Sequence, residues 1–172
     1  MPVTLSRRLL PLLFGAWLLP GIAPSAAEQP LTVSVQRLSM ETALKIAQGA
    51  IAACRAAGIQ IGVTVVDRGG NPQVVLRDVL APDLTLTVSR QKAYTAMSFN
   101  AKLSTLENRF TTPFSVGKVE GLLFSAGGVP IAAGGILYGA VGVSGAPSGE
   151  QDERCAQAGV DAVLEDLELN AM

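Results

Sequence analysis

The N-terminus of the chain limits the fold most, because it has the three-part layout of a cleavable signal peptide. Arg7 and Arg8 precede an apolar stretch from Leu9 to Leu19, and small residues follow it. We expect residues 1–27 to be removed and residues 28–172 to fold as one domain. Because a membrane-spanning helix needs about 20 apolar residues, we expect no stable membrane anchor. The predicted location is periplasmic or secreted.

Two export routes fit this signal. The segment Ser6–Leu10 resembles a twin-arginine signal, while paired arginines are also ordinary in the general secretory pathway. Either destination is oxidising, and two cysteines follow the signal, Cys54 and Cys155. We expect a disulfide between them, because exported proteins keep such bonds. The alternative is two separate buried thiols.

The mature chain has an acidic balance and few aromatic residues. Its roughly 145 residues include 11 basic and 14 acidic side chains, a net charge of −3. Nucleic-acid binders usually present a basic face with aromatic platforms, so we expect no nucleic-acid partner. The length is that of one domain with a single core.

The first half of the mature chain predicts a helix followed by a hairpin. Apolar residues recur at helical spacing from Met40 to Ala57. A β-branched run from Ile59 to Val66 and a second run from Pro72 to Leu76 flank the turn residues Asp67–Asn71. Residues 84–99 contain both strand-forming and helix-forming side chains, and we predict a helix there.

The second half predicts strands and a final helix. Three short apolar runs separated by glycines are expected strands: Gly121–Phe124, Val129–Ala133 and Ile136–Val143. Ser148 and Gln151 form a capping box at the start of the last helix. This order of elements predicts an α+β domain, with a mainly antiparallel sheet and helices packed on its faces.

The chain contains no histidine. This excludes a Ser/His/Asp triad, a histidine general base and histidine ligands to zinc, copper or haem iron. Asp67 and Asp78 flank the predicted hairpin, and we interpret them as a turn cap and an ion-pair partner rather than a catalytic pair. Whether the chain is an enzyme stays open, with a binding function preferred.

Three polar residues are candidates for a binding site. Arg77, Lys92 and Tyr94 combine two cations with an aromatic ring, which suits a flat ligand that carries carboxylates. The alternative is that all three lie on the surface without a ligand.

Several motifs in a fixed order resemble the GlcG/HbpS family. These are V-T-V-V-D-R-G-G-N at Val63–Asn71, S-R-Q-K-A-Y-T-A at Ser89–Ala96, G-G-V-P-I at Gly127–Ile131, G-A-V-G-V-S-G at Gly139–Gly145 and E-Q-D-E at Glu150–Glu153. The similarity extends from about Leu38 to Leu167. It implies a small α/β domain that assembles into homo-oligomers.

The resemblance also implies a class of ligand, because some family members bind haem or cobalamin-like tetrapyrroles, as does the related C-terminal domain of PduO-type proteins. Haem-binding relatives have a histidine after the V-V-D-x-G-G turn, where this chain has Asn71. The expected binding residues are therefore Asn71, Arg77, Lys92 and Tyr94, with haem held without a histidine. The remaining candidate iron ligands are Tyr94, Tyr138, Met40, Met97 and a free cysteine.

Three functions follow from these observations. The first is an exported, non-enzymatic ligand-binding protein whose ligand is haem or another tetrapyrrole. The second is an accessory or structural subunit of an exported redox enzyme, suggested by the twin-arginine-like signal and the shortage of catalytic side chains. The third is a small-molecule enzyme that uses Lys92 or an acid as a base.

Overall fold

The computed structural model describes residues 29–171, so the expected signal peptide lies outside the described residues. Ser34–Met172 forms one compact unit; of Met1–Val33 only residues 29–33 are described, and these form no helix or strand. The helices are α1 (Met40–Ala56), α2 (Leu84–Phe99) and α3 (Gly149–Ala171), and the strands are β1 (Gly62–Asp67), β2 (Pro72–Arg77), β3 (Gly128–Ala133) and β4 (Ile136–Ser144). Within this described part, no helix has both the length and the apolar character that crossing a bilayer requires.

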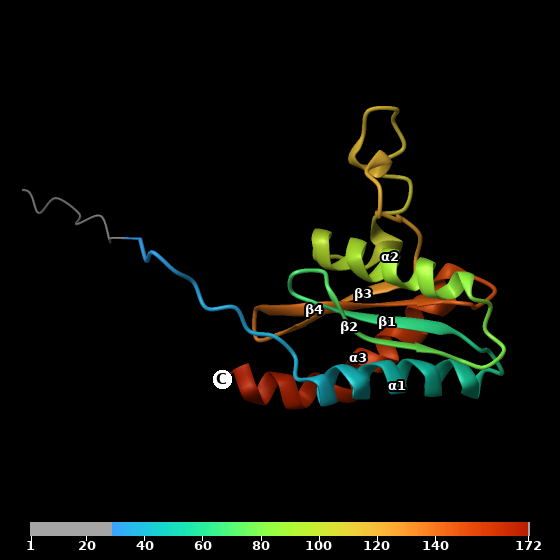
Figure 1. The fold of residues 1–172 in the computed structure, drawn as a ribbon, viewed down its shortest axis with the longest axis horizontal. Helices are drawn as coiled ribbons and strands as arrows, with labels where there is room; N and C mark the ends of the chain where they lie inside the picture. The colour runs from blue at the N-terminus through green and yellow to red at the C-terminus, as the bar shows by residue number, and fades with distance from the viewer. Residues whose placement is uncertain (1–28, 172) are drawn as a thin grey trace, which may run out of the picture. The chain divides into compact units, whose positions relative to one another are not determined.

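The four strands form one antiparallel sheet in the order β2-β1-β4-β3. Helices α1 and α3 cover one face of this sheet, and α2 covers the other (Figure 1). The predicted α+β class and the antiparallel sheet are therefore confirmed. Strands β2 and β3 are the two edges.

Local signals explain where the elements begin and end. The Ser39 hydroxyl accepts a hydrogen bond from the backbone N–H of Thr42 at 3.1 Å and caps α1. The Ser148 hydroxyl accepts from the backbone N–H of Gln151 at 3.3 Å, which is one of the two hydrogen bonds of the predicted capping box. Helix α2 ends at Phe99, and the C-cap residue Asn100 has a left-handed φ of 46°.

The main core lies between the sheet and the pair α1 and α3. A disulfide joins Cys54 of α1 to Cys155 of α3, as predicted from the oxidising destination. The two helices approach closely at glycines, because a Cβ on Gly159 would lie 2.4 Å from the carbonyl oxygen of Ile46. Small residues therefore set the distance between these helices.

A second, smaller core lies under α2 and extends into the long connection to β3. The rings of Phe99, Phe110 and Phe124 form a cluster with centroids 4.7–5.3 Å apart. The predicted strand at Gly121–Phe124 is wrong. The Phe124 ring packs in this cluster, and the backbone N–H of Leu123 donates to the Thr95 hydroxyl at 2.8 Å rather than to a strand.

Candidate functional site

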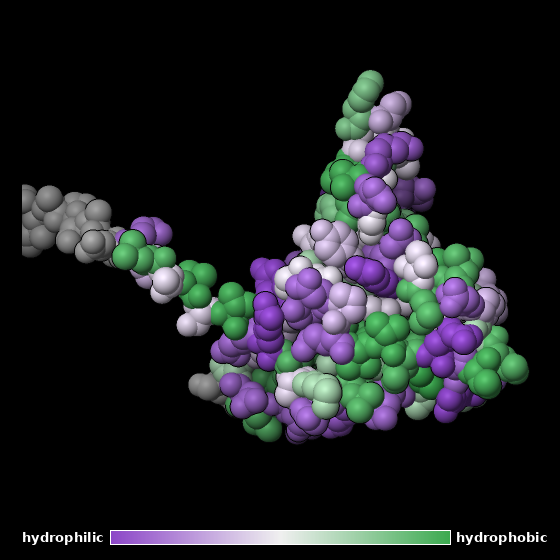
Figure 2. All heavy atoms as spheres, in the orientation of Figure 1, coloured by the Kyte–Doolittle hydropathy of each residue, from purple (hydrophilic) through white to green (hydrophobic). Residues whose placement is uncertain are grey.

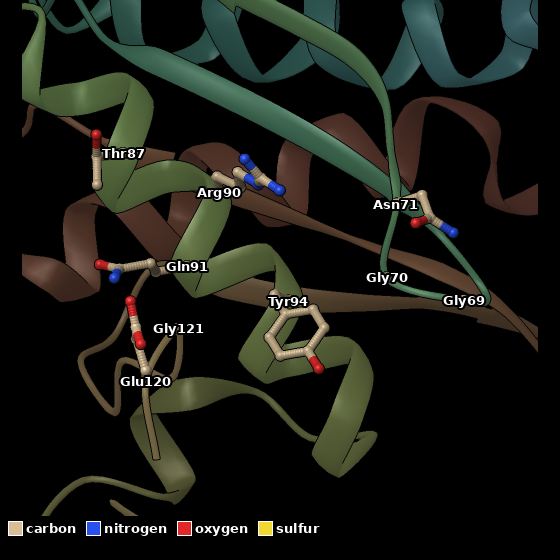
Figure 3. A pocket seen from close by; sticks show the side chains of 9 residues that line it. All are labelled: Gly69, Gly70, Asn71, Thr87, Arg90, Gln91, Tyr94, Glu120 and Gly121. Atoms are coloured by element: carbon tan, nitrogen blue, oxygen red, sulfur yellow. The ribbon is translucent and has the colours of Figure 1, made fainter. Parts of the chain in front are cut away.

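A pocket of about 580 Å³ opens between the β1–β2 turn and α2 (Figure 3). Three segments line it: Gly69, Gly70 and Asn71 from the turn, Thr87, Arg90, Gln91 and Tyr94 from α2, and Glu120 and Gly121 from the connection to β3. Its size lies within the range of about 300–1,000 Å³ that small-molecule sites occupy.

The buried Asp67 holds the turn that forms one wall. Its Oδ1 accepts hydrogen bonds from the backbone N–H groups of Gly69 at 2.8 Å and Asn71 at 2.9 Å. Burial alone would raise the pKa of Asp67, but these hydrogen bonds and the charge of Arg37, 3.4 Å from Oδ2, lower it below its ordinary value. Asp67 is thus an ionised turn cap, as interpreted from the sequence.

Tyr94 and Gly70 lie in direct contact in the pocket wall. A Cβ on Gly70 would lie 2.7 Å from two carbons of the Tyr94 ring, and Gly70 has a φ of +80°. Both the close approach and the left-handed backbone require glycine here. The ring therefore packs directly beneath the turn, and its hydroxyl has no hydrogen-bond partner among residues 29–171 (Figure 3).

The pocket carries one cation and one acid on different segments. Arg90 extends from α2 toward the turn, while Glu120 approaches Gln91 from the other side (Figure 3). Among residues 29–171, neither Arg90 nor Glu120 forms an ion pair. A guanidinium in that position is available to a carboxylate on a ligand.

The structure brings together two of the four residues predicted to bind ligand. Asn71 and Tyr94 line the pocket. Arg77 instead donates to the carbonyl oxygen of Ala81 at 2.5 Å, at the end of β2. Lys92 is buried and also lies outside the pocket lining.

Lys92 forms a buried ion pair between α2 and α3. Its Nζ lies 2.8 Å from Oδ2 of Asp152, and the two side chains are 4% and 5% exposed. Oδ1 of Asp152 accepts from the backbone N–H of Ala146 at 2.9 Å. Burial raises the pKa of Asp152, against the opposing effect of Lys92. The pair ties two helices together beneath the surface rather than facing a ligand.

The sequence contained a signal for Arg90, which is the cation that lines the pocket. Helical neighbours share a face at spacings of three and four residues, so Tyr94 shares its face with Arg90, Gln91 and Thr87. Lys92 is only two positions from Tyr94, and its side chain leaves the helix in another direction. Nothing in the local sequence signalled Glu120, which a long connection brings to the pocket.

Tyr94 is the one predicted iron ligand that lines this pocket. Cys54 and Cys155 are joined, Tyr138 is buried, and the buried Met97 has its sulfur 3.9 Å from a donor nitrogen of Arg68. Within residues 29–171 no three His, Cys, Asp or Glu side chains group to hold a metal ion. Among the lining residues, the Tyr94 ring and the Arg90 guanidinium fit the flat ring and one carboxylate of a porphyrin.

Comparisons with known proteins agree with this architecture. The structure superimposes on that of a double mutant of Streptomyces reticuli HbpS with a TM-score of 0.74 and 38% identity, covering 84% of this chain and 99% of that one. Klebsiella pneumoniae ORFY is similar at a TM-score of 0.74 and 24% identity, covering 79% of this chain and 97% of that one. The structure of a PduOC:heme complex is similar at a TM-score of 0.66 and 24% identity, covering 74% of this chain and 95% of that one.

A search of curated protein sequences gives no significant match. The sequence profile described as "Haem degrading protein HbpS-like" matches residues 38–161, which includes the sheet, all of α1 and α2 and half of α3. The match covers most of the chain and agrees with the resemblance in the ordered motifs. The chain therefore belongs to the HbpS-like family.

Proposed function

We propose that this protein is an exported, non-enzymatic binder of haem or a related tetrapyrrole, which it holds in the pocket between the β1–β2 turn and α2. The observation that carries the proposal is the placement of the Tyr94 ring and the Arg90 guanidinium in one pocket. A porphyrin offers an apolar ring and carboxylates. The haem-related description of the family supports the same class of ligand.

Binding on these contacts relies on the ring and the carboxylates of the ligand. The Tyr94 side chain is 39% exposed, so it keeps apolar surface that a flat ligand can bury. Arg90 supplies charge-assisted hydrogen bonds to a carboxylate, while Thr87, Gln91 and Asn71 add neutral polar groups. With no histidine in the chain, we expect modest affinity that depends little on the metal.

The pocket composition supports binding rather than catalysis. Its titratable side chains are Arg90, Tyr94 and Glu120, and it contains neither a cysteine nor a lysine. No nucleophile and base are therefore paired among the lining residues. Lys92, one of the bases suggested for a small-molecule enzyme, is paired with Asp152 and does not line the pocket. The Cys54–Cys155 disulfide supports export, because such bonds persist in oxidising compartments.

Titration of residues 28–172 with haemin, followed by absorbance, tests the proposal. Arg90→Ala should weaken binding about fivefold, since an exposed charge pair is worth about 1 kcal/mol. Arg154→Ala removes an exposed arginine of α3 and should leave the affinity unchanged. Equal affinity of both variants would refute the assigned pocket, and no binding of haemin or porphyrin would favour the accessory-subunit alternative.

A further inference from the structure

Glu120 reaches the pocket on a hydrogen-bonded turn in the connection from α2 to β3. The backbone N–H of Leu122 donates to the carbonyl oxygen of Val119 at 3.3 Å, which closes a turn with Glu120 and Gly121 at its two central positions. Gly121 has a φ of +87°, a conformation that a turn of this kind can require at its third residue. The backbone that carries the Glu120 carboxylate is therefore defined by its own turn.

The same turn is attached to the α2 wall of the pocket. The backbone N–H of Leu123 donates to the hydroxyl of Thr95 at 2.8 Å, and this hydroxyl donates to the carbonyl oxygen of Gln91 at 2.7 Å. Thr95 is buried, and Gln91 lines the pocket. These two hydrogen bonds hold the turn against α2, and the Glu120 side chain lies beside Gln91 (Figure 3).

The two charges of the pocket lie at different sides of it. Arg90 points toward the Gly69–Asn71 turn, whereas Glu120 lies on the side of the connection to β3 (Figure 3). Hydrophilic and intermediate residues predominate over α2 in the space-filling view (Figure 2), so charge distinguishes the two sides more than apolar contact does. A ligand carboxylate gains charge-assisted hydrogen bonds near Arg90 and is repelled near Glu120.

We propose that Glu120 determines which tetrapyrroles this pocket accepts and which way round they lie, an inference that rests on the proposed function. Haem and protoporphyrin carry both propionates on one side of the ring and only methyl and vinyl groups on the other. The propionate side lies toward Arg90, and the uncharged side lies beside Glu120. The ligand class is therefore a tetrapyrrole whose carboxylates are confined to one side.

Coproporphyrin III is the matched probe for this selection. It has the substituents of protoporphyrin except that propionates replace the two vinyl groups, so carboxylates lie on both sides of the ring. In either orientation one of them lies beside Glu120 and is repelled. An exposed charge pair is worth about 1 kcal/mol, so this repulsion should weaken binding about fivefold.

Variants at Glu120 and Arg90 separate selectivity from affinity. Glu120→Gln keeps the size of the side chain and removes its charge, while Glu120→Asp keeps the charge. Arg90→Ala removes an attraction that both porphyrins share, so it should weaken both about fivefold and leave their ratio unchanged. Glu165→Gln is the matched control, because Glu165 is exposed on α3 and does not line the pocket.

Titration of residues 28–172 with protoporphyrin and with coproporphyrin III, followed by absorbance, gives the selectivity as a ratio of dissociation constants. The unmodified protein, Glu120→Asp and Glu165→Gln should all prefer protoporphyrin by at least about fivefold. Glu120→Gln should lower this ratio about fivefold by strengthening the binding of coproporphyrin III, with the protoporphyrin affinity changed by less than about twofold.

The outcomes distinguish this inference from the proposed function. Equal binding of both porphyrins by the unmodified protein, or an unchanged ratio in Glu120→Gln, would overturn the role of Glu120 and leave the tetrapyrrole pocket standing. A ratio that falls as far in Glu120→Asp as in Glu120→Gln would also overturn it, because the charge would then not be the cause. Failure of the unmodified protein to bind either porphyrin would refute the proposed function and this inference together.

Discussion

Replacing Lys92 by methionine separates a structural role for this lysine from a binding role. The substitution keeps a long side chain but leaves the carboxylate of Asp152, 5% exposed, without its partner at 2.8 Å. Removing one member of a buried ion pair costs about 3–5 kcal/mol. Asp152 still accepts a hydrogen bond from the backbone N–H of Ala146 in this variant. We therefore expect a loss of unfolding free energy at the lower end of this range, about 3 kcal/mol.

Urea unfolding measures this cost. With a slope near 2 kcal/mol per molar, a loss of about 3 kcal/mol lowers the midpoint by about 1.5 M without changing the slope. Lys102→Met is the matched control, because Lys102 is exposed and its loss should change the unfolding free energy by less than about 0.5 kcal/mol. Adding Asp152→Asn to Lys92→Met should restore most of the lost stability, since it removes the unpaired charge.

The pH dependence gives an independent check. Burial already raises the pKa of Asp152, and removing Lys92 raises it further. A group whose pKa is raised in the folded state is stabilised there by protonation, so the deficit of Lys92→Met should shrink as the pH falls through that pKa. Unchanged unfolding together with weakened porphyrin binding would refute the structural role and return Lys92 to the ligand site.

Three further predictions follow from other contacts. Cys54→Ala with Cys155→Ala opens a cross-link between residues 101 positions apart, so we expect a loss of about 2–5 kcal/mol in denaturant unfolding; an unchanged midpoint would contradict this. Gly159→Ala places a Cβ 2.4 Å from the carbonyl oxygen of Ile46 and should cost about 1–3 kcal/mol, whereas an unshifted melting temperature would show that the helices separate freely. Asp67→Asn removes a carboxylate whose pKa is lowered on folding, so its destabilisation should be complete above about pH 4 and shrink as the pH falls through the folded pKa; a constant difference across the acid range would count against the turn cap.

Local chemistry made much of the fold predictable. The expected helix from Met40 to Ala57 differs from α1 by one residue, because apolar periodicity and the Ser39 cap act within the helix itself. The hairpin followed in the same way from two β-branched runs and the turn residues between them. The disulfide was predictable in kind from the compartment, and the packing of α1 on α3 brings the two cysteines together.

Long-range packing decided what local patterns could not. Gly121–Phe124 has the apolar character of a strand, yet Phe124 packs on Phe99 and Phe110, which are distant in the sequence. The strand order β2-β1-β4-β3 likewise depends on how the halves of the chain pair, and periodicity alone does not specify it.

In the candidate site, too, some residues were predictable from local sequence and others are placed by long-range packing. Tyr94 and Asn71 were identified from residue type and from the family motif, and both line the pocket. Lys92 has a suitable charge but lies on the face of α2 that meets Asp152, a partner 60 positions away. The contribution of Arg90 follows from helical spacing once α2 is assigned, whereas Glu120 is placed by the tertiary fold alone.

The most direct test of a tetrapyrrole site without a histidine is a comparison of haemin with metal-free protoporphyrin. Residues 28–172 should bind both with dissociation constants that agree within about fivefold, and Tyr94→Phe, which keeps the ring and removes the hydroxyl, should change neither by more than this. Tight haemin binding with a sharp Soret band, lost in Tyr94→Phe and absent for protoporphyrin, would contradict the account by showing that an iron bond holds the ligand.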